Sequence, residues 1–589
     1  MAGNDTIRTK PKDAKGTLLR MLSYLGPYKL FIFMICLVCL LGNLLALLGP
    51  SMAGKAINEV SAGKGQVNFD MVNYYAIRMA ICYILSAVIT IFINSAMLLV
   101  SKWVSRKLRK DIFEKLMKLP VGYFDTHQAG DIISRVSYDV DVIGTCLATD
   151  VVQILTNIVT VMGSLVMMIV ISPLLSLTVI ITVPMAIGYT AHLKKITHPL
   201  YSKRSKNYGR MNGFVEEMLS GQKTIISYAY EDTVEANFDS INRDVADSYN
   251  NAEYHGCCTG PTVNLINNLG LSFIAVFGSI LYMFEMISIG NISSFVLYSR
   301  KFSGPINEIA NVVNEIYSAL SATERVFTLL DAGEELADSD TATELTDVKG
   351  KVNLKKVYFG YDRRKTIIND LNLDVDPGKL IAIVGPTGAG KTTIINLLMR
   401  FYDVNSGNVL VEDKAIMDLT RSSLRSAYAM VLQDTWVFNG TIFDNIAYGK
   451  ENATREEVEA AAKAAHIHHF IMRLPKGYDT VISEDGGNIS KGQKQLLTIA
   501  RAMLYDAKML ILDEATSNVD TGTEREIQKA MRSLMKDKTC FVIAHRLSTI
   551  QHADAILVLD HGDVVEQGTH ESLMEKKGFY YNLYASQFE

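Results

Sequence analysis

GPTGAGKT, at residues 385–392, is the stretch that decides how this 589-residue chain is organised. It follows an apolar run at 380–384 and precedes a helical pattern at 394–399, so it joins a strand to a helix. Its spacing, G-x-x-x-x-G-K-[S/T], is that of a phosphate-binding loop, whose glycines let backbone N–H groups approach phosphate oxygens. The stretch therefore predicts an α/β domain that binds a nucleotide, with Lys391 supplying charge and Thr392 a hydroxyl for Mg²⁺. The residues expected around the phosphates are Gly385, Pro386, Thr387, Gly388, Ala389, Gly390, Lys391, Thr392 and Thr393.

Two adjacent carboxylates, Asp513 and Glu514, end a buried-strand pattern at 509–512. An aspartate at a strand end opposite a phosphate loop holds Mg²⁺, and a neighbouring glutamate polarises the attacking water. Taken alone, the pattern is better explained as a capped strand end. Because the phosphate loop is also present, we favour a site for phosphoryl transfer, with Asp513 at the metal and Glu514 as the catalytic carboxylate.

Long uncharged runs occupy the first half of the chain. Hydrophobic residues make up 49% of the sequence, and the mean hydropathy of +0.15 is high for a soluble protein. A spanning helix needs about 20 apolar residues, and uncharged runs cover 30–54, 79–101, 151–191 and 257–284. The run at 151–191 is long enough for two helices, and 286–322 is a further span interrupted by Arg300, Lys301 and Glu308. We expect an all-α membrane domain with six spans over residues 1–330.

Basic residues indicate the orientation of these spans. The N-terminus and the long loops 102–150 and 192–254 are rich in Lys and Arg, whereas the short segments near 55–73 and 285–290 carry few. Both termini and both long loops are therefore expected in the cytoplasm, and the long loops should continue as helices beyond the bilayer. The first apolar run is too long for a cleavable signal peptide. The chain is expected to be a multi-pass protein of the cell membrane.

Charge and cysteine content weigh against other classes of protein. The net charge of −4 predicts no nucleic-acid partner. Seven scattered cysteines predict neither disulfides nor a metal–thiolate site. The acidic, polar stretch 331–349 has no apolar periodicity and is expected to link the membrane domain to a second domain at 350–589.

Further motifs accompany the phosphate loop. NISKGQKQ at 488–495 precedes a helical run at 496–504, Gln433 lies between this segment and the loop, and His545 follows a strand-like run at 539–544. In this order the motifs resemble those of the ATP-binding cassette (ABC) transporters, and the likeness covers nearly the whole chain. The resemblance implies that two cassettes enclose two ATP molecules, each held between the phosphate loop of one cassette and the signature of the other.

The resemblance also implies individual roles in the nucleotide half. Tyr361 would stack on adenine, Gln433 would meet Mg²⁺ and the attacking water, and His545 would contact the γ-phosphate. Glu514, Gln433 and His545 would be the catalytic residues. The signature that covers the ATP of a partner would be formed by Ser490, Lys491, Gly492 and Gln493.

The membrane half carries the same resemblance. Phe124 and Asp125, with Asp139 further along, look like the first coupling loop of ABC exporters, and a second coupling segment is expected near 208–221. Glu324-Arg325-Val-Phe327 looks like part of their sixth helix. Six spans followed by one cassette is the order of an exporter half-transporter, which would pair with a second half-transporter.

At one position the sequence departs from the family pattern. The signature LSGGQ is ISKGQ at 489–493, so Lys491 replaces a glycine that lets backbone N–H groups close onto the γ-phosphate. Harmless drift at a tolerant position is one explanation. We favour another, in which this chain is the catalytically intact subunit of a heterodimeric bacterial multidrug exporter and Lys491 covers a slow ATP site on the partner.

The expected function is ATP-driven export of amphipathic small molecules, lipids or peptides by alternating access. A homodimeric lipid flippase, an importer with the exporter fold and, from a different class, an ATP-gated regulator or channel remain as alternatives. Arg300 and Lys301, at bilayer depth, are candidates for the substrate path. An equally good interpretation is that both side chains are merely solvated in a wet cavity.

Overall fold

The chain forms two compact units. The computed structural model describes residues 13–586 apart from 62, 64, 363, 434, 484–486, 514–519 and 544–550. The first unit comprises Met1–Lys118 and His127–Gly333, and the second comprises Leu119–Thr126 and Glu334–Glu589. The second unit thus includes a short segment from the N-terminal half of the sequence.

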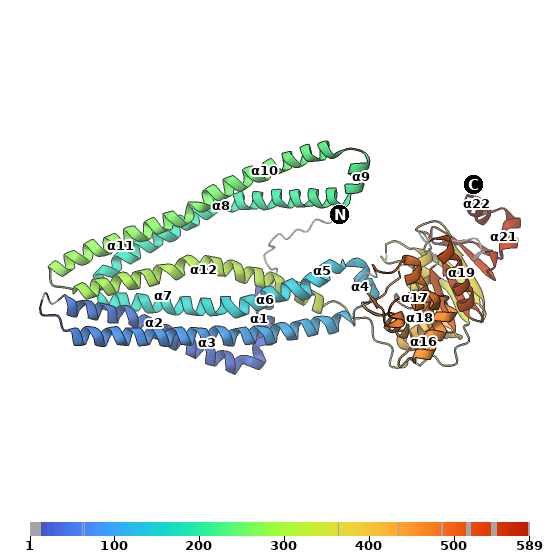
Figure 1. Ribbon diagram of the computed structural model, residues 1–589, viewed down its shortest axis with the longest axis horizontal. Coiled ribbons are helices and arrows are strands. Elements are labelled where there is room, and N and C mark those ends of the chain that lie inside the picture. Colours follow the sequence, from blue (N-terminus) through green and yellow to red (C-terminus); the bar gives the residue numbers. More distant parts are fainter. Residues whose placement is uncertain are drawn as a thin grey trace. The chain divides into compact units, whose positions relative to one another are not determined.

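The first unit is helical throughout its described elements (Figure 1). Its long helices are α2 (Lys29–Val60), α3 (Phe69–Leu116), α7 (Val151–Ile171), α8 (Pro173–Ser220), α10 (Glu231–Cys257), α11 (Thr259–Met283) and α12 (Ile289–Leu330). The shorter elements are α1 (Ala14–Leu25), η1 (Gly26–Tyr28), α5 (Ala129–Ser134), η2 (Arg135–Asp139), α6 (Val140–Thr145), η3 (Cys146–Asp150) and α9 (Gln222–Ser227). Of these, η2 and η3 are π-helical turns set within the helical stretch that leads into α7.

Four segments of the described chain are long and apolar enough to cross a membrane by length and composition. They are Ala14–Val60, Phe69–Leu116, Ala129–Ile171 and Glu231–Met283. Two further spans expected from the sequence fall on the long helices α8 and α12, of 48 and 42 residues, each of which begins with an uncharged run. The prediction that the long loops are helical is confirmed, because α3 continues to Leu116 and α8 to Ser220.

The run at 151–191 forms two helices, and the chain turns between them at Ser172. The Ser172 hydroxyl accepts a hydrogen bond from the backbone N–H of Leu175, at 3.2 Å, and so caps the start of α8. Pro173 is the first residue of the helix, where its missing N–H would have had no partner within the helix.

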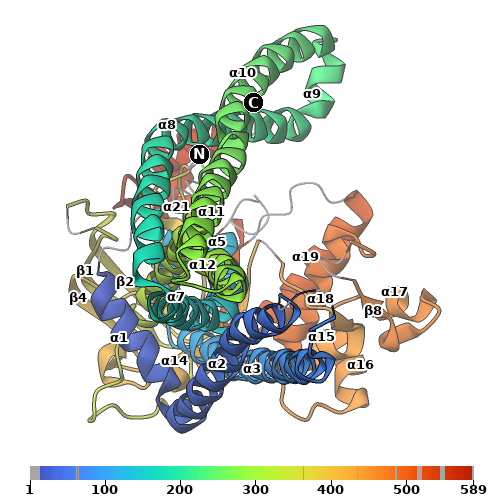
Figure 2. The same cartoon turned by 90° about the vertical axis from the view of Figure 1, so that its left-hand side faces the viewer.

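Helices α8 to α11 form an arm within the first unit. The α8 helix packs along α10 and α11, and the short α9 turns the chain between them (Figures 1 and 2). Arg210 of α8 pairs with Asp244 of α10 at 3.4 Å, and Arg204 pairs with Glu253 further along the same two helices. The helices α2, α3, α7 and α12 pack together as a second group.

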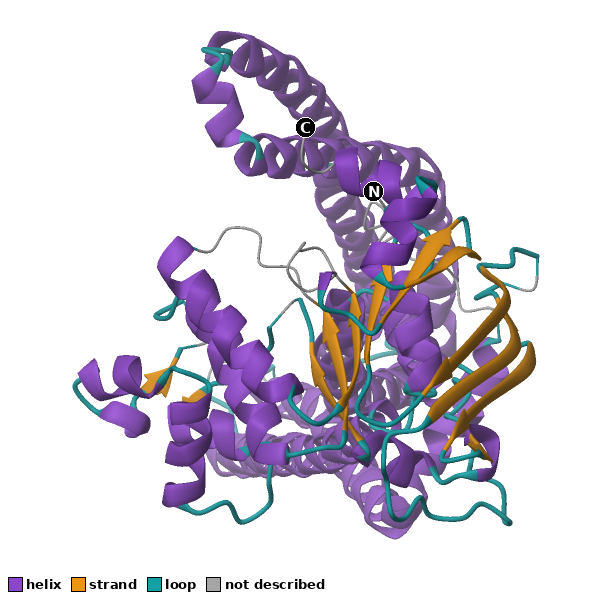
Figure 3. Ribbon diagram, turned by 90° about the vertical axis from the view of Figure 1, so that its right-hand side faces the viewer, coloured by secondary structure: helices purple, strands orange, loops and turns teal. Residues whose placement is uncertain are grey.

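The second unit contains sheets covered by helices (Figure 3). A six-stranded sheet has the order β12-β11-β3-β10-β9-β6, and a four-stranded sheet has the order β2-β1-β4-β5. The strands are β1 (Val352–Phe359), β2 (Ile368–Val375), β3 (Leu380–Val384), β4 (Ser406–Val411), β5 (Lys414–Ala415), β6 (Tyr428–Val431), β7 (Gly440–Thr441), β8 (Val481–Ile482), β9 (Met509–Asp513), β10 (Thr539–Ile543), β11 (Ala555–Asp560) and β12 (Asp563–Gly568). The helices are α4 (Val121–Thr126), α13 (Lys391–Leu398), α14 (Arg421–Ser426), α15 (Ile442–Ala447), α16 (Arg455–Ala464), α17 (His468–Arg473), α18 (Lys491–Tyr505), α19 (Thr521–Met535), α21 (His570–Lys576) and α22 (Phe579–Ser586), with the short turns η4 (Ile416–Asp418) and η5 (Gly477–Asp479).

The six-stranded sheet brings the ends of distant segments to one edge. Strands β11, β3, β10, β9 and β6 run parallel, and β10 lies between β3 and β9. Their near-continuous apolar sequences are buried on both faces, as is typical of parallel sheets covered by helices. Ligands bind outside the carboxyl ends of such strands, and the phosphate loop begins where β3 ends.

The acidic stretch at 334–349 is held against the second unit by side-chain contacts. Asp338 accepts hydrogen bonds from the backbone N–H and guanidinium of Arg421, at 3.0 and 2.7 Å. Glu335 accepts from the guanidinium of Arg425, and the backbone N–H of Leu345 donates to Ser423 at 3.0 Å. Two carboxylates of this stretch, Glu335 and Asp338, therefore have specific basic partners.

Candidate functional site

The phosphate loop requires glycine at several of its positions. A Cβ added to Gly385 would lie 2.3 Å from the carbonyl oxygen of Leu559, so no larger residue fits there. Gly388 and Gly390 have φ values of +86° and +103°, in the region that favours glycine. Gly390 is also the N-cap of α13, so the free N–H groups of that helix face the space enclosed by the loop. The loop therefore has the backbone conformation that phosphate binding requires.

Lys391 points back into the loop that it follows. Its ammonium donates to the carbonyl oxygens of Gly385, at 2.8 Å, and Pro386, at 3.0 Å. Burial lowers the pKa of this ammonium below its usual value, and the nearby Asp513 carboxylate partly opposes that shift. The phosphate oxygens of a bound nucleotide would replace these two neutral carbonyl partners. They would give the ammonium negatively charged acceptors in their place.

The carboxyl edge of the parallel strands gathers the other expected groups. Asp513 ends β9 and lies level with Ile543 of β10, which in turn pairs with Ile383 at the end of β3. Gln433 is exposed and follows the end of β6, the strand on the other side of β9. The structure therefore brings Asp513 and Gln433 to the edge where the phosphate loop begins. Oxygen donors from Thr392, Gln433 and Asp513 are the ligand type that Mg²⁺ prefers.

Two of the expected catalytic residues, Glu514 and His545, lie outside the described residues. The described strands that precede them end at Asp513 in β9 and at Ile543 in β10. The strand predicted at 509–512 is confirmed, and the strand predicted at 539–544 is confirmed over its described residues 539–543.

Tyr361 is packed between the phosphate-loop helix and a second tyrosine. Its hydroxyl lies 3.3 Å from that of Thr393 and accepts a hydrogen bond from Asn396 at 3.1 Å. Its ring meets that of Tyr402 edge to face, with centroids 4.8 Å apart. Sequence reasoning missed Tyr402, because its only local signal is an aromatic pair, Phe401-Tyr402, at the end of α13.

Tyr402 also binds the short segment that the second unit takes from the N-terminal half. Its hydroxyl donates to the Asp125 carboxylate at 2.5 Å. A Cβ on Gly122 would lie 2.9 Å from the Tyr402 ring, so glycine permits this close approach. Phe124, the other residue predicted for coupling, is 42% exposed. Tyr402 thus joins the predicted coupling segment to the aromatic expected at the base of the nucleotide.

The predicted signature forms the start of α18. Ser490 is the N-cap, and its hydroxyl accepts from the backbone N–H of Gln493 at 3.3 Å. The Gln493 side chain accepts in return from the backbone N–H of Ser490 at 2.8 Å, which completes a capping box. Lys491 is the first helical residue and is exposed, whereas Gly492 is buried. The sequence signal therefore marks a well-formed helix N-terminus with a cation at its tip.

In the first unit, Lys301 contacts a helix that proline interrupts. Pro50 lies inside α2 and has no N–H to offer to the carbonyl of Ala46, four residues earlier. The Lys301 ammonium donates to that carbonyl at 2.7 Å and lies 5.5 Å from the centroid of the Tyr83 ring. Arg300, its neighbour on α12, is exposed.

Three other α12 residues reinforce this contact with α2. Tyr298 and Ser294 donate to the backbone carbonyls of Leu47 and Pro50, at 2.5 and 2.8 Å. At the end of the same face, Gly290 donates its backbone N–H to the Asn58 side chain at 2.7 Å. The N-terminal half of α12 is thus fastened to α2 by residues spaced three or four positions apart.

An ion pair between a buried carboxylate and a half-exposed guanidinium joins two segments that the sequence suggested separately. The Arg325 guanidinium of α12 donates two hydrogen bonds to Asp139 of η2, at 2.9 and 2.5 Å. Asp139 is almost fully buried, whereas the arginine side chain is 47% exposed. This bidentate geometry fixes α12 against the π-helical turn.

Known protein families account for both halves of the chain. The family described as the ABC transporter transmembrane region matches residues 32–306, and the ABC transporter family matches residues 368–517. A Bacillus subtilis protein described as the uncharacterized ABC transporter ATP-binding protein YfiC is 42% identical over 99% of this chain and 96% of its own length. The chain belongs to the ABC transporters.

Further comparisons narrow the family to exporters. A fatty acid ABC transporter ATP-binding/permease protein of Mycobacterium bovis is 43% identical over 81% of this chain and 75% of its own length. A solved structure of a bacterial Atm1-family ABC exporter with ATP bound has a TM-score of 0.75 and 31% identity, covering 95% of this chain and 98% of that one. This ABC transporter is therefore a multi-pass membrane protein whose cassette binds ATP and couples its hydrolysis to export. Proteins of this kind work as dimers.

Proposed function

We propose that this chain is the hydrolysing subunit of a heterodimeric exporter of amphipathic molecules. The observation that carries the proposal is the convergence of the phosphate loop, Asp513 and Gln433 at one sheet edge, together with a lysine at the tip of the signature helix. Hydrolysis needs Glu514 to orient the attacking water, Lys391 to hold the phosphates and His545 to contact the γ-phosphate. Mg²⁺, held by Thr392, Gln433 and Asp513, supplies charge that stabilises the transferring phosphoryl group.

Lys491 supports the assignment of a partner. A cation at a helix N-terminus opposes the helix dipole, at a cost of about 0.3–1 kcal/mol. A phosphate group from a nucleotide on the partner cassette would reverse that cost, because the dipole and the lysine would then both attract it. The lysine side chain also fills space that glycine leaves open, so the ATP it covers should be held rather than rapidly cleaved.

The coupling between the units is proposed to pass through two segments. Phe124 and Asp125 lie in the segment that Tyr402 holds, and a second segment lies near 208–221 at the far end of α8. Both termini, both segments and the cassette are proposed to be cytoplasmic, with substrate moving outward. Arg300 is a candidate for the substrate path, since it is exposed on α12, whereas Lys301 has a structural partner.

The test is Glu514→Gln in the complex purified from its native membrane. We expect ATP binding to persist and steady-state hydrolysis to fall at least about 100-fold, as for the loss of a group that acts only in the transition state. Intact-mass analysis of the same preparation should show a second half-transporter at equal stoichiometry. Undiminished hydrolysis would disprove the catalytic role, and a dimer of two 65.3 kDa chains would disprove the heterodimer.

A homodimeric lipid exporter is the second candidate. The relative described as a fatty acid transporter favours a substrate with a lipid chain. In a homodimer Lys491 would cover both ATP sites, so Lys491→Gly would change hydrolysis at both. In the heterodimer the same substitution changes hydrolysis at the partner site alone.

A further inference from the structure

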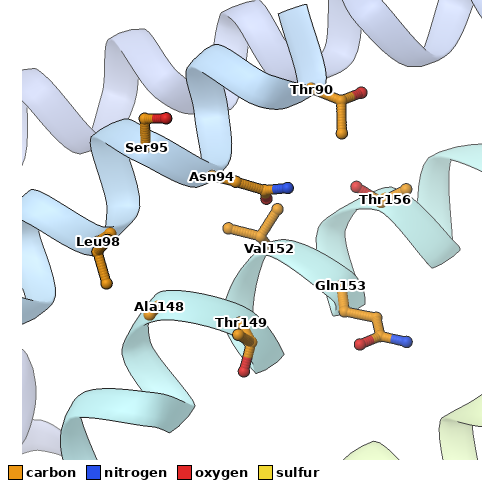
Figure 4. Close-up of a pocket in the computed structure, with 9 residues that line it drawn as sticks. All are labelled: Thr90, Asn94, Ser95, Leu98, Ala148, Thr149, Val152, Gln153 and Thr156. Atoms are coloured by element: carbon orange, nitrogen blue, oxygen red, sulfur yellow. The ribbon is translucent and has the colours of Figure 1, made fainter. Parts of the chain in front are cut away.

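A cavity lined by uncharged side chains, both apolar and polar, lies between α3 and the start of α7. It has a volume of about 560 Å³, within the range of small-molecule sites. Its lining comprises Thr90, Asn94, Ser95 and Leu98 of α3, with Ala148, Thr149, Val152, Gln153 and Thr156 of η3 and α7 (Figure 4). These α3 residues lie near the end of the uncharged run 79–101, and Ala148 and Thr149 end the long loop expected in the cytoplasm, so the cavity is at the cytoplasmic end of the expected spans.

Three of the four hydroxyl groups on this wall, those of Thr90, Thr149 and Thr156, have partners within the protein, and no partner is described for that of Ser95. Thr90 donates to the carbonyl of Ser86 at 2.9 Å, and Thr149 donates to the Asp150 side chain at 2.7 Å. The Thr156 hydroxyl lies 3.5 Å from the Cys39 thiol. Threonine in spanning helices commonly bonds in this way, so these threonines do not by themselves require a ligand.

The side-chain amides of Asn94 and Gln153 differ from these threonine hydroxyl groups, because they have hydrogen-bonding groups to spare. Asn94 is exposed on α3 and makes no side-chain hydrogen bond with any other residue that the structure describes. Figure 4 shows its amide in the space between the two helices. Gln153 donates one N–H to the Glu308 carboxylate of α12 at 3.0 Å, and its carbonyl oxygen and second N–H have no partner among the residues that the structure describes. Removing such amide groups from water is costly unless they meet a polar partner.

These free groups define the chemistry of the partner. Asn94 and Gln153 each offer both a donor and an acceptor, so a ligand satisfies them fully only if it also donates and accepts. Uncharged hydroxyl or amide headgroups do both. A carboxylate only accepts and would face the Glu308 charge. An ammonium only donates and leaves the N–H groups of both amides unpaired.

We propose that this cavity holds the uncharged, hydrogen-bonding headgroup of an amphipathic substrate, with Asn94 and Gln153 as the contacting residues. Glu308 is a positioning residue, because it acts by orienting the Gln153 amide. The π-helical turn η3 carries Ala148 and Thr149 of the wall, and π-turns within helices are frequent at functional sites. The inference rests on the proposed function, since it names the substrate class of that exporter.

The test compares three probes with the same chain length and different headgroups. Decyl glucoside, decylammonium and decanoate are added below their micellar concentrations to the full transporter in phosphatidylcholine nanodiscs, and stimulation of ATP hydrolysis is measured. The same probes, radiolabelled, are followed for ATP-dependent uptake into inside-out vesicles. We expect the glucoside to stimulate hydrolysis and to be taken up at concentrations about ten-fold lower than the two charged probes.

Substitutions test the named contacts. Asn94→Leu and Gln153→Leu should each raise the concentration of glucoside needed for half-maximal stimulation about ten-fold. Glu308→Gln keeps an acceptor for Gln153. It should therefore raise the concentration of glucoside needed for half-maximal stimulation less than Asn94→Leu or Gln153→Leu does. Asn268→Leu makes the same chemical change at an exposed asparagine of α11 outside the cavity, and should leave both hydrolysis and the glucoside response unchanged.

Each outcome decides one of the two proposals. A wild-type transporter that hydrolyses ATP but prefers a charged probe, or responds to none or equally to all, overturns the inference about the headgroup and leaves the proposed exporter standing. An unchanged glucoside response in Asn94→Leu and Gln153→Leu also overturns it. Absence of ATP hydrolysis in the wild-type complex would instead refute the proposed function.

Discussion

Lys301→Met tests whether the lysine replaces the hydrogen bond that Pro50 removes from α2. The methionine keeps most of the side-chain volume and loses the ammonium. The carbonyl of Ala46 would then have neither a helical N–H nor the lysine, which lies 2.7 Å away in the structure. Loss of a hydrogen bond from a charged donor costs about 1.5–3 kcal/mol, and loss of the contact with the Tyr83 ring adds about 0.5–1 kcal/mol.

A second background isolates the hydrogen bond itself. In Pro50→Ala the new N–H can bond to the Ala46 carbonyl, so Lys301→Met should then cost only the ring contact. The difference between the two backgrounds, about 1.5–3 kcal/mol, is the coupling energy between positions 50 and 301.

The measurement is the free energy of unfolding in mixed micelles, followed by the fluorescence of Trp103. The chain has two tryptophans, and Trp436→Phe in every variant leaves Trp103 as the reporter. Trp103 suits this purpose because its ring stacks on Tyr28, with centroids 5.1 Å apart, within the first unit. Equal losses from Lys301→Met with and without the Pro50→Ala substitution would refute the reasoning.

Three further outcomes follow from the described contacts. Tyr402→Phe keeps the ring against Tyr361 but loses the bond to Asp125, so substrate moved per ATP hydrolysed should fall while ATP affinity changes less than about two-fold; a matched fall in affinity would contradict this. Asp139→Asn should destabilise the first unit by about 1–3 kcal/mol, discounted because Arg325 is half exposed, and a variant as stable as wild type would rule out a stabilising ion pair. Burial lowers the pKa of Lys391 in the nucleotide-free protein, and bound ATP should raise that pKa because its phosphates stabilise the charged ammonium. The affinity for ATP should therefore weaken as the pH rises from the lowered pKa of Lys391 towards 10.5. A Kd for ATP that stays constant over this alkaline range would refute the prediction.

Local sequence signals predicted the nucleotide half well. The phosphate loop works through the backbone of a few adjacent residues, so the pattern at 385–392 was enough to place a strand before it and a helix after it. The capping box of Ser490 and Gln493 is likewise contained within a single turn. Uncharged runs also predicted long apolar helices, and four described segments are long and apolar enough to cross a membrane, because the length of a spanning helix is set by the bilayer.

Contacts between residues far apart in the sequence could not be predicted from local patterns. The lysine at 301 could be recognised as a charge at bilayer depth, yet its partner is a carbonyl freed by a proline 251 positions earlier in the chain. The sequence left two equally good interpretations of that charge, a substrate path or a solvated side chain. The structure shows neither of these but a hydrogen bond to the carbonyl of Ala46. Tyr402 was missed for the same reason, since Asp125 lies 277 residues away.

The acidic stretch at 334–349 shows how composition can hide structure. Its polar, aperiodic sequence suggested only a linker. Its carboxylates pair with Arg421 and Arg425, more than 80 residues later. A segment can lack apolar periodicity and still be specifically held when its partners are cations on another element.

The assignment of Leu119–Thr126 to the second unit means that the cassette is not a continuous piece of the chain. A fragment cut at Glu334 would retain the strands and the phosphate loop but would leave the face of Tyr402 uncovered. Adding the missing segment as a separate peptide should restore that face without a covalent bond. The contacts of the second unit, and not a single boundary in the sequence, therefore define which residues it needs. An exchange of cassettes between relatives would have to transfer both Leu119–Thr126 and Glu334–Glu589.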